Sequence, residues 1–130
     1  MTINKRVITY GSYDVLHRGH INLLHRAKAL GGYLIVGLSS DRFNQIKQKR
    51  TFYPLADRRL IIESLRFVDE VIIEDSWEQK ATDVVKHQID ILVMGDDWAG
   101  KFDHLKNLCE VLYLPRTPSI SSTMVKAELF

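Results

Sequence analysis

The chain has 130 residues, a formal net charge of +2 and a single cysteine, Cys109. This length is typical of one domain, so we expect residues 1–130 to form a single domain. Hydrophobic residues make up 45% and charged residues 26%, which excludes a wholly disordered chain. The low net charge argues against a general nucleic-acid binder, and a single cysteine excludes an intramolecular disulfide.

The N-terminal sequence MTINKRVITYG has no apolar stretch of the length expected for a signal peptide. No part of the chain approaches the ~18 consecutive apolar residues of a membrane span. A lone cysteine also fits a reducing compartment. We therefore expect a cytoplasmic protein that does not insert into membranes.

Strand and helix patterns alternate along the chain. Short aliphatic and β-branched runs predict strands, and apolar residues three or four apart predict helices. Gly31-Gly32 is a predicted helix stop. In chain order, the predicted elements are a strand at Arg6–Tyr10, a helix at Ile21–Leu30, a strand at Tyr33–Leu38, a helix that follows Pro54 and includes Leu60–Leu65, a strand at Glu70–Ile73, a helix at Ala81–His87, strands at Ile89–Met94 and Val111–Leu114, and a helix at Val125–Leu129.

This alternation predicts an α/β fold, a Rossmann-like three-layer sandwich with a central parallel five-stranded sheet. In such folds, ligands bind outside the carboxyl ends of the strands, at the point where the strand order reverses. The candidate functional residues should therefore follow the strands.

The first predicted strand leads into Gly11-Ser12-Tyr13-Asp14-Val15-Leu16-His17-Arg18-Gly19-His20. His17 and His20 are three residues apart, which places them on one side of a helical turn. Gly19 allows close approach of an anion to the backbone, and a helix N-terminus attracts phosphate. Taken alone, the pair could equally be two surface histidines at a turn. No other cysteine, histidine or carboxylate has ligand spacing here, so we expect no metal site built from protein side chains.

A strand followed by HxGH resembles the nucleotidyltransferase superfamily, and ITYGSYDVLHRGHINLL is similar to the start of glycerol-3-phosphate cytidylyltransferases. Four further blocks resemble the same family: RRLIIESLRFVDEVI, DSWEQK, VMGDDWAGKFD, and CEVLYLPRT leading into ISST. The resemblance covers nearly the whole chain. It implies transfer of a cytidylyl group from CTP to glycerol 3-phosphate, giving CDP-glycerol and pyrophosphate for teichoic-acid or capsular polymer synthesis.

The resemblance also implies roles for individual residues. His17, His20 and Lys47 are the implied catalytic residues, with Lys47 and Lys80 as contacts of the glycerol phosphate. The implied nucleotide-binding residues are Ser12, Tyr13, His17, His20, Lys49, Arg66, Asp97, Arg116, Thr117, Ile120, Ser121, Ser122 and Thr123. Ser119 stands where this family usually has a glycine, which puts the path of that loop in question.

Each of these positions also has a purely structural interpretation. Ser121 or Ser122 could cap the last helix, and the loop lysines could be solvated. If the loop is extended, Lys47 and Lys49 lie on one side of it and Arg50 on the other. Trp77 is more often a packing residue than a ligand contact.

The reaction implied by the resemblance needs charge neutralisation and positioning more than a general base, because the acceptor is already an anion. Mg²⁺ is the implied cofactor, bound mainly through the CTP phosphates. CTP and glycerol 3-phosphate are the implied substrates, and the relatives suggest a homodimer. The alternatives are a cytidylyltransferase for another phosphorylated small alcohol, and a non-catalytic nucleotide sensor on the same fold.

Overall fold

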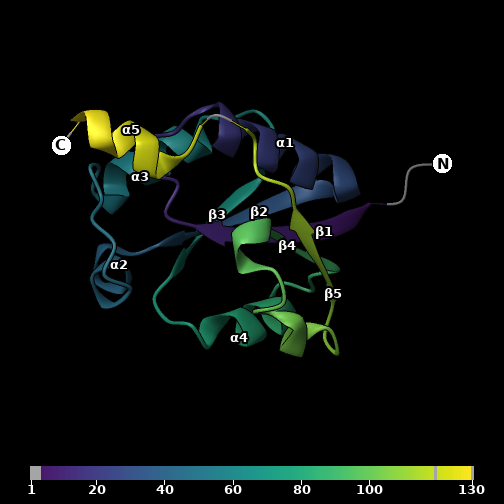
Figure 1. Ribbon diagram of the computed structural model, residues 1–130. Coiled ribbons are helices and arrows are strands. Elements are labelled where there is room, and N and C mark those ends of the chain that lie inside the picture. The colour runs from purple at the N-terminus through teal and green to yellow at the C-terminus, as the bar shows by residue number, and fades with distance from the viewer. Residues whose placement is uncertain (1–3, 119, 130) are drawn as a thin grey trace.

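The computed structural model describes residues 4–118 and 120–129, and it contains a five-stranded sheet between layers of helices (Figure 1). All neighbouring strands are parallel, in the order β3-β2-β1-β4-β5. The predicted Rossmann-like sandwich with a parallel five-stranded sheet is confirmed. The strands are β1 (Lys5–Gly11), β2 (Gly32–Ser39), β3 (Glu70–Glu74), β4 (Ile91–Gly95) and β5 (Glu110–Leu114).

Helices cover both faces of this sheet. In Figure 1, α1, α3 and α5 lie on one face and α4 lies on the other. The helices are α1 (Arg18–Gly31), α2 (Asp41–Ile46), α3 (Leu55–Glu63), α4 (Gln79–Lys86) and α5 (Ser122–Leu129), with 3₁₀ turns η1 (Asp96–Trp98) and η2 (Asp103–Leu105).

Alternate residues of the central strand supply two separate cores. Val7 of β1 packs with Leu24 of α1 and Ile62 of α3 in the first core. Its neighbour Ile8 points to the opposite face and packs with Val84 of α4. Each of these side chains is almost fully buried, and each such burial stabilises the fold by about 1.5–3 kcal/mol. The two cores hold the strand ends rigidly, and the candidate residues follow those ends.

Helix α1 begins and ends where its sequence requires. His17 is its N-cap, with extended backbone, and Gly32 is its C-cap in the left-handed region at φ 95°. A Cβ on Gly31 would lie 2.4 Å from the carbonyl oxygen of Lys5. The predicted helix stop at Gly31-Gly32 is therefore confirmed, because both positions need glycine for different reasons.

Several predicted boundaries were wrong. The second predicted helix ends at Glu63, because the Leu65 N–H bonds to the carbonyl of Ile62 in a tighter 3₁₀-type turn. The fourth strand begins at Ile91, two residues later than predicted, and α5 begins at Ser122, before the predicted Val125. Helix α2 and the two 3₁₀ turns were not predicted, since they are too short to show a periodic pattern.

The strand order reverses at β1, which pairs with β2 on one side and β4 on the other. A crevice at this point is where open α/β sheets bind their ligands. Within residues 4–118 and 120–129, no helix combines the length and apolar content needed to cross a membrane.

Candidate active site

The carboxyl edge of the sheet gathers candidate residues from several crossovers. The two histidines follow β1 at the start of α1, and Lys47 follows β2 at the end of α2. Asp97 follows β4 within η1, and Arg116 follows β5. The prediction that these side chains cluster at one edge is in agreement with this topology.

The two histidines form a stacked pair. Their ring centroids are 3.9 Å apart, with 23° between the ring planes. Nδ1 of His17 accepts the Gly19 N–H at 3.0 Å, and Nδ1 of His20 accepts the His17 N–H at 3.3 Å. Because each Nδ1 is an acceptor, the proton of each neutral ring is on Nε2. Each neutral imidazole therefore carries its N–H donor at Nε2.

Burial keeps this pair neutral. It lowers the pKa of His20 to about 3, helped by the nearby His17 and Lys126. Burial also lowers the pKa of His17, with the Arg18 charge as a second cause. A Cβ on Gly19 would lie 2.8 Å from Cε1 of His17, so glycine is required for this capping geometry.

The segment after β5 lies across the start of α1. Asn22 donates to the Thr117 hydroxyl at 3.2 Å, and Arg18 donates to the carbonyl of Pro118 at 3.3 Å. A Cβ on Gly19 would come within 3.5 Å of Cγ2 of Ile120. The start of α1 and the segment after β5, both predicted from the sequence to bind phosphate, are thus brought together.

Other residues of that segment have structural roles as well. The Ser121 hydroxyl accepts the Met124 N–H at 3.2 Å and so caps α5, as the structural interpretation allowed. Thr123 is exposed in the first turn of α5, and Ser122 is the first residue of that helix. Ser119 lies outside the described residues.

Asp97 and Arg116 form an ion pair with each other across the tips of β4 and β5. Both side chains are more than half exposed. A pair at this exposure contributes little to stability, so it can open to contact a ligand at low cost.

Lys47 lies at the carboxyl end of β2, where its Nζ donates to the Ser39 hydroxyl at 2.7 Å. Burial lowers the pKa of Lys47 to about 8, and the charge of Lys49 adds to the shift. Burial also lowers the pKa of Lys49, with Lys126 as the next cause. Several cations therefore lie close together in this part of the site, which suits an anionic ligand.

The predicted reason for the convergence of Lys47 and Lys49 was wrong. Lys47 has helical backbone, and Gln48 turns the chain at φ 58°, so this segment is not extended. The Lys49 N–H instead bonds back to the carbonyl of Asn44 at 2.8 Å. Both lysines nevertheless line the same pocket, because the turn at Gln48 folds them toward it.

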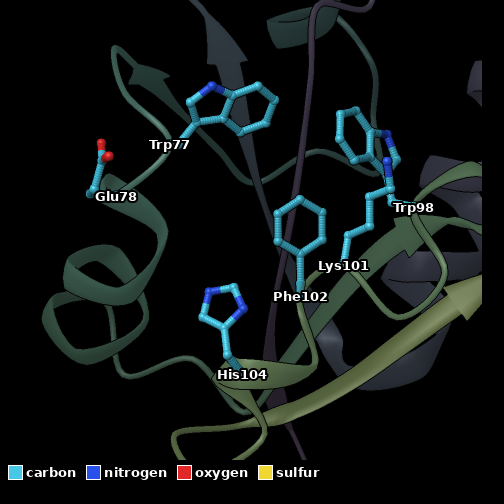
Figure 2. Close-up of a pocket in the computed structure, with 6 residues that line it drawn as sticks. All are labelled: Trp77, Glu78, Trp98, Lys101, Phe102 and His104. Atoms are coloured by element: carbon cyan, nitrogen blue, oxygen red, sulfur yellow. The ribbon is translucent and has the colours of Figure 1, made fainter.

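Two adjoining pockets lie beside the lysines. The inner pocket, of about 30 Å³, is lined by Tyr10, Gly11, Lys47, Lys49, Glu74, Trp77, Lys80, Met94, Trp98 and Phe102. The outer pocket, of about 350 Å³, is lined by Trp77, Glu78, Trp98, Lys101, Phe102 and His104 (Figure 2). The Trp77 and Trp98 rings contact each other, with 5.7 Å between centroids, and the Phe102 ring lies 5.5 Å from that of Trp98 (Figure 2). These three rings belong to both pockets.

Lys80, predicted to bind the acceptor, is buried at the inner pocket. Its Nζ donates to Glu74 at 2.5 Å, and both side chains are almost fully buried. Burial raises the pKa of Glu74, and Lys80 opposes that shift. The sequence reasoning missed Glu74, although a carboxylate directly after the apolar run Val71–Ile73 was a usable signal.

Ser12 and Tyr13 have buried side chains behind the histidines. The Ser12 hydroxyl donates to Oδ1 of Asn44 at 2.8 Å, and the Tyr13 ring contacts His20 edge-on with 5.3 Å between centroids. Tyr13 has a φ of 46°, and burial raises its pKa to about 12. Both residues support the histidine turn from below.

Arg58 is a supporting residue that the sequence reasoning missed. Its guanidinium is fully buried and donates to the carbonyls of Ser12 at 3.1 Å and Ser39 at 2.8 Å. It thereby joins the ends of β1 and β2. The sequence carried a signal for this role. Arg58 lies one helical turn before the apolar Ile62 and so shares the buried face of α3.

Asp14 was also missed as a structural centre. Its buried carboxylate accepts the N–H groups of Phe52 at 2.5 Å and Tyr53 at 3.0 Å, and it lies 3.2 Å from Nζ of Lys126. Burial alone would raise the pKa of Asp14, but these hydrogen bonds and Lys126 outweigh it, so the pKa is lowered. Asp14 thus fastens both α5 and the segment before α3 to the active-site turn.

Arg66 was also predicted to bind the CTP phosphates. It is exposed in the turn after α3. Within residues 4–118 and 120–129, it has no hydrogen bond or ion pair with another candidate residue.

Comparisons with known proteins agree with this geometry. The model of the cytidylyltransferase-like family matches residues 8–128. The glycerol-3-phosphate cytidylyltransferase of Bacillus subtilis (strain 168) is 58% identical over 96% of this chain and 97% of its own length. The enzyme of that name from Staphylococcus aureus (strain NCTC 8325 / PS 47) is 57% identical over 97% and 96%.

A solved structure supports the fold. The lipopolysaccharide core biosynthesis protein from Thermoplasma volcanium GSS1 matches 87% of this chain and 98% of its own, with a TM-score of 0.74 and 25% identity. The family match, the full-length identities and the stacked HxGH pair all agree. The chain therefore belongs to the cytidylyltransferase-like family and, within it, to the glycerol-3-phosphate cytidylyltransferases.

Proposed function

We propose that this chain transfers a cytidylyl group from CTP to glycerol 3-phosphate at the carboxyl edge of its sheet. An oxygen of the acceptor phosphate attacks the α-phosphorus of CTP, the bond from that phosphorus to the bridging oxygen breaks, and pyrophosphate leaves. The observation that carries this proposal is the stacked pair of His17 and His20, neutral and donating from Nε2 beside a cluster of lysines. CDP-glycerol made in this way would serve teichoic-acid or capsular polymer synthesis.

The histidines stabilise charge and do not remove a proton. Their Nδ1 lone pairs already accept backbone N–H groups, and Nε2 carries the proton. A general base is unnecessary, because the attacking phosphate oxygen is already anionic. The two Nε2–H groups and the N-terminus of α1 instead donate to the α-phosphate as negative charge develops on it. The first turn of α1 has no acidic residue to compete for these donors.

The remaining candidate residues divide between the two substrates. Lys49, Arg116 and the turn of Thr117, Ile120 and Ser121 bind the CTP phosphates, together with Arg66 once that exposed side chain turns toward the site. When CTP binds, the ion pair between Asp97 and Arg116 opens, and Asp97 then lies beside the nucleotide. Lys47 contacts the transferred phosphoryl and the acceptor, and Lys80 contacts the acceptor from the inner pocket.

Mg²⁺ is proposed as a cofactor that binds with the nucleotide. Within residues 4–118 and 120–129, no group of three or more histidine, cysteine or carboxylate side chains could hold a metal ion. A cation bound through phosphate oxygens and water needs no such group, and the lysines would bind the same phosphates without ligating the metal. When bound, Mg²⁺ would neutralise part of the triphosphate charge.

We further propose a cytoplasmic homodimer. Large apolar side chains such as Leu60 and Met124 are more than half exposed on helices of one face of the sheet, which suits contact with a second copy. Sedimentation velocity is the direct test, and a single monomeric species at micromolar concentration would contradict the dimer.

The test of the proposed function is pyrophosphate release with each nucleoside triphosphate and a panel of phosphorylated small alcohols. CTP with glycerol 3-phosphate should give the highest kcat/KM. Comparable turnover with ATP would contradict a cytidylyltransferase, and comparable turnover with another phosphorylated alcohol would contradict the assigned acceptor.

A further inference from the structure

The ammonium group of Lys80 is enclosed by aromatic rings. Its Nζ lies 4.7 Å from the ring centroid of Tyr10, 4.9 Å from that of Phe102 and 5.2 Å from that of Trp77. The Glu74 carboxylate completes the enclosure at 2.5 Å. The Lys80 side chain is only 4% exposed, so its charge is almost entirely removed from water.

Three aromatic faces and a carboxylate are the chemical groups that recognise a ligand ammonium ion. Here the ammonium is supplied by the chain itself. Among the described residues, the Glu74 carboxylate accepts a side-chain hydrogen bond from Lys80 alone. The inner pocket therefore keeps only about 30 Å³, roughly the space of one water molecule.

The enclosure is open toward the acceptor side of the site. Trp77 and Phe102, which contact Lys80, also line the outer pocket of about 350 Å³ (Figure 2). Lys47 faces the same Trp77 ring at 5.7 Å, so a phosphate near Lys47 would lie beside the enclosure. An acceptor with a phosphate at one end and an ammonium at the other could span these two positions if Lys80 were absent.

We propose that Lys80 is a specificity-determining residue. Its ammonium group fills an ammonium-binding cage and so excludes acceptors that carry an ammonium group. This inference rests on the proposed function, since it concerns the acceptor of that reaction. With Lys80 present, an ammonium-bearing acceptor meets like charge and no free space. A polyol phosphate carries only uncharged hydroxyl groups at that end, so it meets no like charge and does not need the space that Lys80 fills.

The test compares glycerol 3-phosphate with ethanolamine phosphate as acceptors, using CTP and pyrophosphate release. Lys80→Ala removes three methylene groups and the ammonium while keeping Glu74 and the rings. We expect kcat/KM for ethanolamine phosphate itself to rise ~30-fold or more, the value of a desolvated cation–π contact, while kcat/KM for glycerol 3-phosphate does not rise. The matched control is Lys86→Ala, an exposed lysine of the same helix α4, which should leave kcat/KM for both acceptors unchanged.

Lys80→Ala leaves Glu74 buried without its cation, so folding needs a separate measurement. Methylammonium chloride should raise the thermal midpoint of Lys80→Ala above that in equal sodium chloride, or restore its folded circular dichroism if it is unfolded. The double variant Glu74→Gln/Lys80→Ala has no unpaired charge and should fold, without the methylammonium effect and without the gain in ethanolamine phosphate use.

These outcomes separate the two proposals. If the wild-type chain does not join CTP to glycerol 3-phosphate, the proposed function is wrong, whatever methylammonium does to the variants. If the wild type is active but Lys80→Ala shows neither methylammonium stabilisation nor a gain in kcat/KM for ethanolamine phosphate, the cage is wrong and the proposed function stands.

Discussion

The His17 imidazole lies stacked on that of His20, with 3.9 Å between ring centroids, and its backbone N–H is the donor to Nδ1 of His20. Protonating one ring would place a positive charge directly against the other. The HxGH turn therefore holds two neutral, nearly parallel imidazole rings, each with one N–H donor. Both rings thus carry the proton on Nε2, and donating it to a phosphate needs no change of tautomer.

Removal of either ring should slow turnover. We expect His17→Ala and His20→Ala each to lower kcat by ~10²-fold or more, as for loss of a transition-state hydrogen-bond donor. His25→Ala, which removes an exposed histidine of the same helix, is the control and should keep kcat. Folded His17 and His20 variants with wild-type kcat would remove the pair from catalysis.

Stability of the ligand-free protein should fall on mild acidification. His20 has a folded-state pKa of about 3 against an ordinary value of 6.5. The unfolded chain therefore takes up a proton below pH 6.5 that the folded chain does not bind, and stability is lost progressively from pH 6.5 toward pH 3. Urea unfolding at pH 7 and pH 5 should show the loss, with a smaller loss for His20→Gln. Equal losses in both proteins would contradict the neutral buried histidine.

The sheet, the two cores and the clustering of the site could be predicted because each rests on a strong local signal. The aliphatic runs predict strands, and parallel strands bring their following residues to one edge. Gly31-Gly32 predicts the end of α1, because Gly32 takes the left-handed conformation and Gly31 allows the close approach of Lys5. The same reasoning predicts that His17, Lys47 and Arg116 lie near one another, because each follows a strand of the parallel sheet.

The supporting interactions could not be predicted, because they join residues far apart in the chain. Lys80 and Glu74 are both charged, and nothing local indicates that they are buried as a pair. The contact of Asp14 with Lys126 depends on how α5 lies on the sheet. The turn at Gln48 was missed because positive φ outside glycine leaves little trace in a sequence.

The loop lysines should have separable effects. We expect Lys47→Ala to impair kcat and the use of glycerol 3-phosphate, since Lys47 lines the inner pocket together with Lys80. Lys49→Ala should mainly raise the KM for CTP. Arg50→Ala should matter least, since it does not line the inner pocket. The measurement is steady-state kinetics at varied CTP and acceptor. If Arg50→Ala is the most damaging change and both lysine variants behave like the wild type, the phosphate-binding face was assigned wrongly.

The Asp14 carboxylate should be important for stability. Asp14→Ala leaves the N–H groups of Phe52 and Tyr53 without their acceptor and removes the partner of Lys126. We expect a loss of about 2–4 kcal/mol in the free energy of unfolding, from two unsatisfied donors and an unpaired cation. The control is Asp57→Ala, an exposed aspartate in the first turn of α3, which should cost no more than ~1 kcal/mol, the value of a carboxylate at an exposed helix N-terminus. Equal losses in the free energy of unfolding for the two variants would show that the Asp14 contacts do not stabilise the fold.

The most direct test of the central claim is phosphorus NMR of the purified protein with CTP, glycerol 3-phosphate and Mg²⁺. The proposed reaction predicts that the CTP and glycerol 3-phosphate signals fall together, while CDP-glycerol and pyrophosphate appear in equal amounts. The same products should be lost with His20→Ala. Formation of CMP without CDP-glycerol, or no consumption of CTP at all, would contradict the account.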